Sequence, residues 1–392
     1  MSLSDKPFDI VVFGASGYTG RLVAEYLAAE YAGSDLKWAM AGRSLEKLAA
    51  VRAEMGISEA VELLAVDVDN PDSVTQMVDA CQVVITTVGP YQLYGDELVK
   101  QCAERGTDYV DLTGEPSWMH ETIAQYSSAA KASGARIVHS CGFDSIPFDL
   151  GVYWLQQHAI AKTGQPIAMV KGRVRAMNGT FSGGTIASMR ATMASAKANP
   201  AIIQVLTNPF ALTEGFTGPE QPAGMAPQYD EELKSWSAPF IMAPINTKNI
   251  HRSNFLLGHQ YGEDFRYDEM LLTGDGDQGK AAADYVAKDD SVAKSDLQPG
   301  EGPTKEEREN GNYDAIFAGE TQDGELMISS VQGDRDPGYG STSKMLAEAA
   351  MCLLVNPDLA SGGLWTPAAA MGDALMARLQ EHAGLTFKIE KG

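Results

Sequence analysis

Three glycines near the start of the chain have the spacing of a dinucleotide-binding turn. Gly14, Gly17 and Gly20 follow an apolar run at 8–13 and open a stretch at 18–31 with helical spacing of apolar residues. The first glycine permits a tight turn, the second lets the backbone approach a pyrophosphate, and the third lets the helix pack close to the sheet. The amides and dipole of the helix start hold phosphate charge. The segment is therefore predicted to bind a dinucleotide.

Hydroxyl and guanidinium groups around this turn favour NADP(H) over NAD(H). Ser16 and Thr19 can add hydroxyl donors within the turn. Arg43 and Ser44 follow a predicted strand at 36–41, where NAD-binding proteins usually carry a carboxylate for the ribose 2′-hydroxyl. The fork of a permanently charged arginine matches a 2′-phosphate, and the serine can donate to it. The alternative is that Arg43 only caps the turn.

Two further strand ends are expected to face the same crevice, because ligands bind outside the carboxyl ends of parallel strands. Asp67 follows a predicted strand at 61–66 and is expected near the adenine. Gly89, Pro90 and Tyr91 follow a strand at 82–87 and are expected beside the ribose and nicotinamide. Tyr91 either has a function in the site or serves only to anchor the turn.

Hydride transfer also needs a proton donor, since the nicotinamide supplies only the hydride. Polar side chains at the later strand ends are the candidates, namely Tyr91, Tyr94, Asp111, Glu115, His139, Asp144 and Ser145. Tyr91 is the first choice for a catalytic residue and Asp144 the second. Capping of the following helix is the alternative role for Asp144 and Ser145, and a structural role is the alternative for His139.

Other chemistries are weighed against the same residues. A short-chain dehydrogenase needs Tyr-x-x-x-Lys, and none of the 14 tyrosines has a lysine four residues later. The GASGYTG opening also resembles semialdehyde dehydrogenases, in which Cys141 would be a nucleophile, whereas its alternative is a small buried thiol. A non-enzymatic NADPH-binding scaffold or sensor stays open. No His/Cys cluster has zinc-ligand spacing, so no metal is expected.

Strands that alternate with helices must position these residues. Six strand-like runs with helical stretches between them predict an α/β fold, a Rossmann-type doubly wound parallel sheet, over 1–146. Residues 147–335 predict a second α+β domain for substrate or oligomerisation, and 336–392 a C-terminal helical segment. Within the second domain, 207–262 has little periodicity and is expected to be a lid, an oligomer contact or short strands. The charged stretch 289–311 is expected to be a surface loop.

Composition limits the partners and the location. The 392-residue chain has a formal net charge of −22, which repels nucleic acid, so none is expected as a partner. No apolar run approaches the roughly 20 residues that span a bilayer, and no signal sequence opens the chain. We therefore expect a cytoplasmic protein that binds a small molecule, with a homodimer as the candidate assembly.

Several blocks of sequence resemble one family along nearly the whole chain. They are VVFGASGYTGRLVAEYL (11–27), AGRSLEKL (41–48), TTVGPYQLYGDELVKQCAERGTDYVDLTGE (86–115), HSCGFDSIPFDLGVYWL (139–155), SGGTIASM (182–189) and DPGYGSTSKMLAEAAMCLL (336–354). The chain resembles the saccharopine dehydrogenase-like oxidoreductases, which include trans-acting enoyl reductases.

The resemblance implies a Rossmann domain, a second α/β domain and a C-terminal helix that packs back towards the first. It implies NADP(H) bound by Gly14, Ser16, Gly17, Tyr18, Thr19, Gly20, Arg43, Gly89 and Tyr91. It does not imply saccharopine as the substrate, because fold alone does not fix function. The enoyl reductase members suggest hydride addition to a carbon–carbon double bond of a lipid-like substrate.

Overall fold

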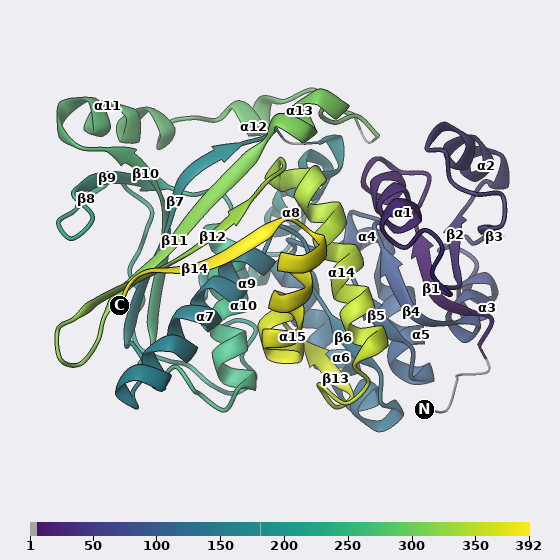
Figure 1. Cartoon of the computed structure of the whole chain (residues 1–392), viewed down its shortest axis with the longest axis horizontal. Helices are drawn as coiled ribbons and strands as arrows, with labels where there is room; N and C mark the ends of the chain where they lie inside the picture. The colour runs from purple at the N-terminus through teal and green to yellow at the C-terminus, as the bar shows by residue number, and fades with distance from the viewer. Residues whose placement is uncertain (1–5, 181, 299) are drawn as a thin grey trace.

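Two seven-stranded sheets organise the chain (Figure 1). The computed structural model describes residues 6–180, 182–298 and 300–392. The first sheet belongs mainly to the N-terminal part of the chain, and the second to the part that follows α7 (Ile146–Thr163).

The first sheet is entirely parallel and has the order β13-β6-β5-β4-β1-β2-β3. Its strands are β1 (Phe8–Phe13), β2 (Trp38–Gly42), β3 (Glu62–Ala65), β4 (Cys81–Thr86), β5 (Asp108–Val110), β6 (Arg136–Val138) and β13 (Gly363–Trp365). The helices that follow the first five strands are α1 (Tyr18–Glu30), α2 (Leu45–Glu54), α3 (Pro71–Ala80), α4 (Tyr91–Tyr94), α5 (Asp96–Arg105) and α6 (Pro116–Ser133). The predicted Rossmann-type sheet is confirmed.

Alternate side chains of β1 explain why both faces of this sheet are covered. Ile10 and Val12 pack into a core shared with α1, α2 and α14 (Thr342–Val355), whereas Val11 and Phe13 pack with α3, α5 and α6. From Ile10 to Phe13 the run is therefore apolar without a break, because neither face meets water there.

The second sheet is mixed and has the order β14-β12-β11-β7-β10-β9-β8. Only β7 and β10 pair in parallel, and the other pairs are antiparallel. The strands are β7 (Met169–Asn178), β8 (Gln228–Asp230), β9 (Ser235–Pro239), β10 (Arg266–Gly274), β11 (Asn312–Glu320), β12 (Leu326–Gly333) and β14 (Leu385–Lys391). The predicted second α+β unit is confirmed as a fold class.

Helices cover the inner face of the second sheet. α7 packs on β11 and β12, and α10 (Ala243–Leu256) packs on β10. A Cβ built on Gly151 of α7 would lie 2.0 Å from the ring of Phe317, so glycine sets how closely this helix approaches the sheet. The outer face carries ion pairs such as Arg175 with Asp314 and Glu390.

The C-terminal residues return to both sheets. A short π-helical turn, η1 (Pro337–Ser341), leads into α14, which packs against α1 and β4. β13 then joins the first sheet beside β6, and α15 (Pro367–His382) leads to β14 in the second sheet. The expectation of a helical segment at 336–392 did not include these two strands. The division into domains at 146 and 335 stays a prediction.

Two segments that the sequence left irregular contain regular elements. Residues 207–262 include β8, β9 and the buried helix α10. The charged stretch 289–311 includes two short helices, α12 (Ser291–Lys294) and α13 (Lys305–Asn310), after α11 (Gly276–Val286). The homodimer contact expected from 207–262 stays a prediction.

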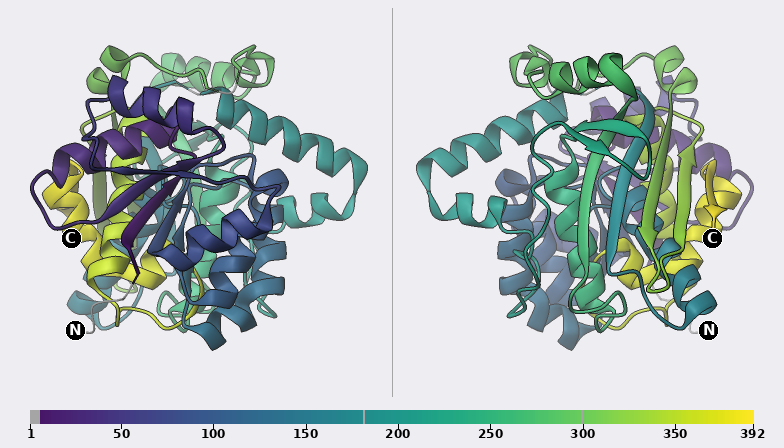
Figure 2. Two further views of the ribbon diagram at one scale, coloured as in Figure 1. Left: turned by 90° about the vertical axis from the view of Figure 1, so that its right-hand side faces the viewer. Right: turned by 90° about the vertical axis from the view of Figure 1, so that its left-hand side faces the viewer.

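One pair of helices projects from the body of the molecule. α8 (Gly183–Ala198) and α9 (Ala201–Thr207) form a hairpin that extends to one side of both sheets (Figure 2). Gly183 and Ile186 are the buried residues of α8, and α9 has none. Among the described residues, no helix is both long and apolar enough to cross a bilayer. The cytoplasmic location stays a prediction.

Candidate functional site

A cavity of about 470 Å³ lies where the carboxyl ends of the first sheet meet the second part of the chain. Most of its large lining side chains are apolar: Leu112, Phe143, Met177, Met189, Met193, Leu206, Phe240, Ile241, Met242 and Ile245. Five of the residues that the sequence singled out also line it, namely Thr19, Gly89, Tyr91, Glu115 and Asp144. The size and apolar walls are typical of a site for a small organic ligand.

The glycine turn has the close contacts that its sequence predicts. Gly14 has a φ of +89°, and a Cβ built on Gly20 would lie 2.2 Å from the Gly14 carbonyl oxygen. Gly17 is exposed at the N-cap of α1 and has no side chain to accept from the first-turn amides, and the first turn of α1 contains no acidic residue. The backbone therefore forms an open cradle for phosphate that a side chain would fill. This geometry fits a dinucleotide.

Arg43 and Ser44 lie at the carboxyl end of β2, where the adenosine part of a dinucleotide is expected. Arg43 is exposed, and Ser44 Oγ accepts a hydrogen bond from the Lys47 amide at 3.2 Å as the N-cap of α2. In this cap Ser44 Oγ is the acceptor, so its hydroxyl proton stays available for a hydrogen bond to a phosphate. A Cβ on Gly42 would lie 3.6 Å from Ser16 Oγ, so Ser16 borders the same end of the strand.

Asp67 is half-buried after β3 and Val66, and its Oδ1 accepts from the Asp69 amide at 3.1 Å. Asp67, Arg43 and Ser44 therefore lie along neighbouring strand ends, outside the residues that line the cavity. These three residues are placed to contact one end of a dinucleotide, and the cavity is placed to receive the other end.

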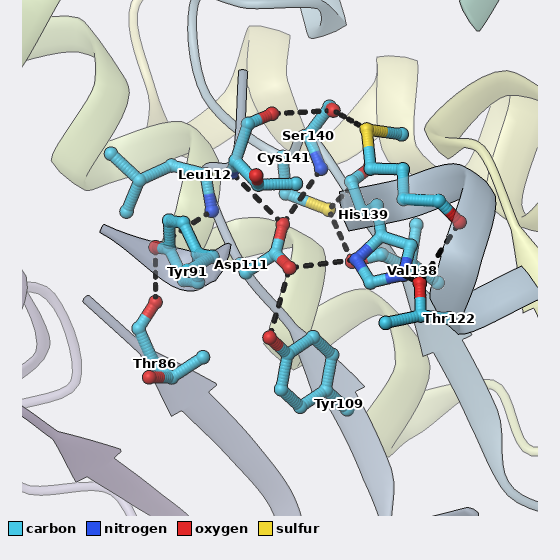
Figure 3. A network of polar contacts seen from close by, with 12 residues as sticks. Thr86, Tyr91, Tyr109, Asp111, Leu112, Thr122, Val138, His139, Ser140 and Cys141 are labelled. Atoms are coloured by element: carbon cyan, nitrogen blue, oxygen red, sulfur yellow. Dashed lines mark hydrogen bonds and ion pairs between the residues drawn. The ribbon is translucent and has the colours of Figure 1, made fainter. Parts of the chain in front are cut away.

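Tyr91 is an anchor of the turn that follows β4. Its hydroxyl donates to the Thr86 carbonyl at 3.1 Å and accepts from the Leu112 amide at 3.4 Å (Figure 3). The ring is buried and stacks on Trp118 with centroids 5.4 Å apart. Burial raises its pKa well above the usual range for tyrosine. These contacts do not support the predicted role of proton donor, although the residue still lines the cavity.

Glu115 holds the same turn from the neighbouring strand end. It is the N-cap residue of α6, but its carboxylate accepts from the amides of Tyr91 and Gln92, at 2.9 and 2.8 Å, at the start of α4. The side chain is buried, and the Gly89–Pro90 bond just before this helix is cis. The sequence singled out Glu115 as a candidate proton donor, but it did not indicate that the carboxylate holds the start of α4.

A buried network supports this floor of the site (Figure 3). Asp111 Oδ2 lies 2.7 Å from His139 Nδ1 and accepts from the Tyr109 hydroxyl at 2.9 Å. Its Oδ1 accepts from the amides of Thr113 and Ser140. Because every partner is satisfied and out of contact with solvent, the network fits the structural role that was the alternative for His139.

Asp144 is the carboxyl group best placed to exchange a proton inside the cavity. It lines the cavity, and no hydrogen bond to its carboxylate occurs among the described residues. Burial raises the pKa of Asp144 to about 7. At neutral pH a substantial fraction of this carboxyl is therefore protonated, as a general acid requires.

Two alternatives from the sequence lack the contacts that they require. Ser145 is the N-cap residue of α7, as the capping alternative expects, but its Oγ accepts from Asn249 Nδ2 at 2.7 Å and bonds no helix amide. Cys141 is fully buried, with Sγ 3.5 Å from the Val138 carbonyl oxygen, and burial raises the pKa of its thiol. A thiol without exposed surface and with a raised pKa lacks the properties of a nucleophile.

The sequence missed the opposite wall of the cavity. Ser182 and Thr185 at the start of α8, and Tyr339 in η1, line the cavity across from the strand ends. The Ser182 amide donates to the Tyr339 hydroxyl, and Thr185 Oγ1 lies 3.0 Å from it. Both segments lie in sequence blocks that resemble the family, so the sequence marked these residues but did not indicate what they do.

The chain is similar to known oxidoreductases. Residues 10–138 match the family model described as the saccharopine dehydrogenase NADP binding domain. A Mycobacterium tuberculosis protein provisionally named trans-acting enoyl reductase Rv2449c is 40% identical over 407 aligned positions, which cover 97% of each chain. The trans-acting enoyl reductase of Mycobacterium bovis is 35% identical over 409 positions, with the same coverage.

A solved structure supports the fold. Saccharopine dehydrogenase (L-Glu forming) from Saccharomyces cerevisiae superposes with a TM-score of 0.55 over 97% of this chain and 99% of that one. The two sequences are 12% identical, so the likeness concerns the fold alone.

Proposed function

The chain belongs to the saccharopine dehydrogenase-like oxidoreductases that include the trans-acting enoyl reductases, and on this premise we propose that it reduces the double bond of an apolar 2-enoyl substrate. Family membership makes it an NADP-dependent oxidoreductase. The observation that carries the finer proposal is one cavity that combines apolar walls with a single unpaired carboxyl, Asp144, at the edge of the cofactor-binding sheet.

NADP(H) fits the residues at this edge. The glycine turn at 14–20 would hold the pyrophosphate, and Arg43 with Ser44 the 2′-phosphate. Asp67 would lie beside the adenosine, and the turn Gly89–Tyr91 beside the nicotinamide end, which faces the cavity. When bound, NADPH supplies the hydride for reduction.

The cavity walls favour a substrate with an apolar chain. Ten large apolar side chains line the space, and four of these are methionines (Met177, Met189, Met193 and Met242). Methionine adapts its shape to irregular apolar ligands. A volume of about 470 Å³ lies within the range of small-ligand sites. An acyl chain that carries a conjugated double bond satisfies both features.

Asp144 would deliver the proton that balances the hydride. Reduction of a 2-enoyl group adds hydride to the β-carbon and a proton to the α-carbon. Asp144 in its neutral form is the donor in this proposal, and bulk water restores its proton between turnovers. Tyr91 is less suited to this role because its hydroxyl proton is engaged by the Thr86 carbonyl.

The test is the oxidation of NADPH, followed at 340 nm, with a trans-2-decenoyl thioester as the substrate. Asp144→Asn should lower kcat about 10²- to 10⁴-fold, the usual contribution of a general acid, and leave the Kd for NADPH unchanged. In the wild type, kcat should fall as the pH rises through about 7, because the carboxyl must be protonated to donate.

Asp358→Asn is the matched control, because Asp358 is an exposed carboxylate outside the cavity, and it should keep the wild-type kcat. Full activity of Asp144→Asn would remove Asp144 from the mechanism. No oxidation of NADPH with enoyl thioesters of any chain length, in a protein that binds NADPH, would refute enoyl reduction.

A further inference from the structure

The side chain of Tyr18 faces away from the phosphate cradle and contacts a distant segment. Its hydroxyl donates to the Pro303 carbonyl and accepts from Arg308 Nη1 at 3.0 Å. Arg308 also donates to the Pro303 carbonyl, at 2.8 Å. A Cβ built on Gly302 would lie 2.6 Å from the Tyr18 ring, so this contact requires glycine there. We call residues 301–308 the strap.

A second tyrosine continues the contact into the cavity wall. The rings of Tyr18 and Tyr339 meet edge to face, with centroids 5.1 Å apart and an interplanar angle of 84°. Tyr339 accepts from the Ser182 amide and lies within hydrogen-bond distance of Thr185 Oγ1. Burial raises the pKa of both phenols, so both hydroxyls keep their protons at neutral pH.

The strap reaches the same helix start by another route. The Glu301 carbonyl accepts from the Gly183 amide at 3.1 Å, and Gly183 is the first residue of α8. Two chains of contacts therefore connect Tyr18 with the beginning of α8, one through Tyr339 and the other through the strap.

The start of α8 matters because it forms one wall of the cavity. Ser182, Gly184, Thr185 and Ser188 line the cavity, and Met189, Thr192 and Met193 continue this lining. The far end of the helix projects from the body with α9 (Figure 2). Further along, Gln92 Nε2 donates to Thr192 Oγ1 at 3.1 Å, and Gln92 Oε1 accepts from the Ser195 hydroxyl at 2.8 Å. Arg190 donates to the Ser295 carbonyl. The residues that fix its base therefore set the shape of the wall.

We infer that Tyr18 and Tyr339 are positioning residues that couple the NADP(H)-binding turn to the α8 wall of the cavity. Tyr18 is the first residue of α1, so phosphate bound at this helix start orders the backbone that carries its ring. A ring fixed in place then holds the strap and Tyr339, and through them Ser182 and Gly183. By linkage, a ligand that holds α8 in turn strengthens cofactor binding.

The experiment is hydrogen exchange followed by mass spectrometry on the full chain, with and without NADPH. In the wild type, NADPH should slow exchange in three segments: 14–22, 182–189 and 301–308. Exchange in 182–189 should slow about fivefold or more, the lower end of typical coupling between sites. In Tyr18→Phe, protection of 14–22 should remain, whereas protection of 182–189 and 301–308 should be largely lost.

Tyr285→Phe is the matched control, because Tyr285 is 73% exposed on α11, and it should behave as the wild type. Tyr339→Phe is the second test variant, for use if Tyr18→Phe unfolds, and it should lose the protection of 182–189 while keeping that of 14–22. The readout needs no substrate, so a failure of enoyl reduction leaves it unaffected.

Three outcomes would overturn the inference. One is NADPH-dependent protection of 14–22 alone in the wild type, and another is no protection of 14–22 at all. The third is the full wild-type pattern in a folded Tyr18→Phe or Tyr339→Phe protein.

Discussion

Arg43 is an exposed cation at the end of β2 with a clear role to test. Arg43→Ala should weaken NADPH binding by about 1.5–3 kcal/mol, the scale of a hydrogen bond to a charged group. This corresponds to roughly 10- to 150-fold in Kd. NADH binding should change little, because NADH lacks the 2′-phosphate. Fluorescence titration with each cofactor measures the effect, and equal losses for both would contradict the assignment.

Buried carboxyl groups make the stability of the protein depend on pH. Burial raises the pKa of Glu269 to about 8 and that of Asp149 to about 7. The folded protein therefore keeps protons that the unfolded chain releases above about pH 4. Stability should decline as the pH rises from about 4.5 to 8, the interval between the unfolded and folded pKa values.

Glu269→Gln tests this dependence. Asn246 Nδ2 donates to one oxygen of Glu269 and the Tyr267 hydroxyl donates to the other. Glutamine, like the neutral carboxyl, keeps one carbonyl acceptor and offers a donor at the second position. The variant should match the wild type near pH 5.5 and exceed its free energy of unfolding by about 1–4 kcal/mol at pH 8.5. Urea unfolding at both pH values measures the difference. The control is Glu381→Gln, whose side chain is 74% exposed, and an equal pH slope in wild type and Glu269→Gln would be evidence against the argument.

The sequence pointed to the candidate cofactor-binding residues more clearly than to the residues that would carry out the chemistry. Glycine spacing and the Arg43–Ser44 pair are local signals, because each depends on one turn after one strand. The roles of Tyr91 and Glu115 depend on a contact between two strand ends, which a single sequence does not display. Tyr91 therefore looked free to donate a proton, although Thr86 and Leu112 engage its hydroxyl.

At the scale of elements, two glycines of the turn meet different physical requirements. Gly20 allows close packing, and Gly17 leaves space for a phosphate. Gly20→Ala should damage both folding and binding, since its Cβ would overlap the Gly14 carbonyl and overpacking costs about 1–3 kcal/mol. Gly17→Ala places its Cβ 3.2 Å from the same oxygen, at a φ of −79° that alanine tolerates. It should keep a melting temperature close to the wild type but weaken NADPH binding, because the methyl group enters the phosphate cradle.

Thermal unfolding and NADPH titration of both variants separate these requirements. A Gly17→Ala protein that binds NADPH as tightly as the wild type would show that the phosphate does not approach at this residue.

The elements that the sequence predicted well each show a single, regular pattern of apolar residues. β1 and β4 are buried on both faces and read as continuous apolar runs. α10 was missed because it is buried nearly all round while carrying polar residues, among them Asn246, Asn249 and Arg252. Some of its buried polar groups find partners in distant segments, as Arg252 does with the carbonyls of Leu212 and Leu364. No periodicity along α10 reveals such partners. β13 was missed because it joins the first sheet from a distant part of the chain, outside the alternation of strands and helices in the first 146 residues.

At the scale of the molecule, the site exists only where separate parts of the chain meet. The first sheet supplies the strand ends, and α8, β9 and α10 with their flanking residues supply most of the apolar walls. η1 adds Tyr339 from the C-terminal part of the chain. A fragment that ends after β6 therefore retains the residues of the cofactor edge but lacks most of the cavity walls.

The position of the last two strands has a consequence for biosynthesis. β13 pairs with β6 and β14 with β12, so each completes the edge of a sheet whose other strands leave the ribosome earlier. Until β13 and β14 emerge, the nascent chain thus carries two open edges of the kind that recruit foreign strands. The pairing of residues 363–365 and 385–391 covers these edges, so these two late pairings also protect the growing chain from aggregation.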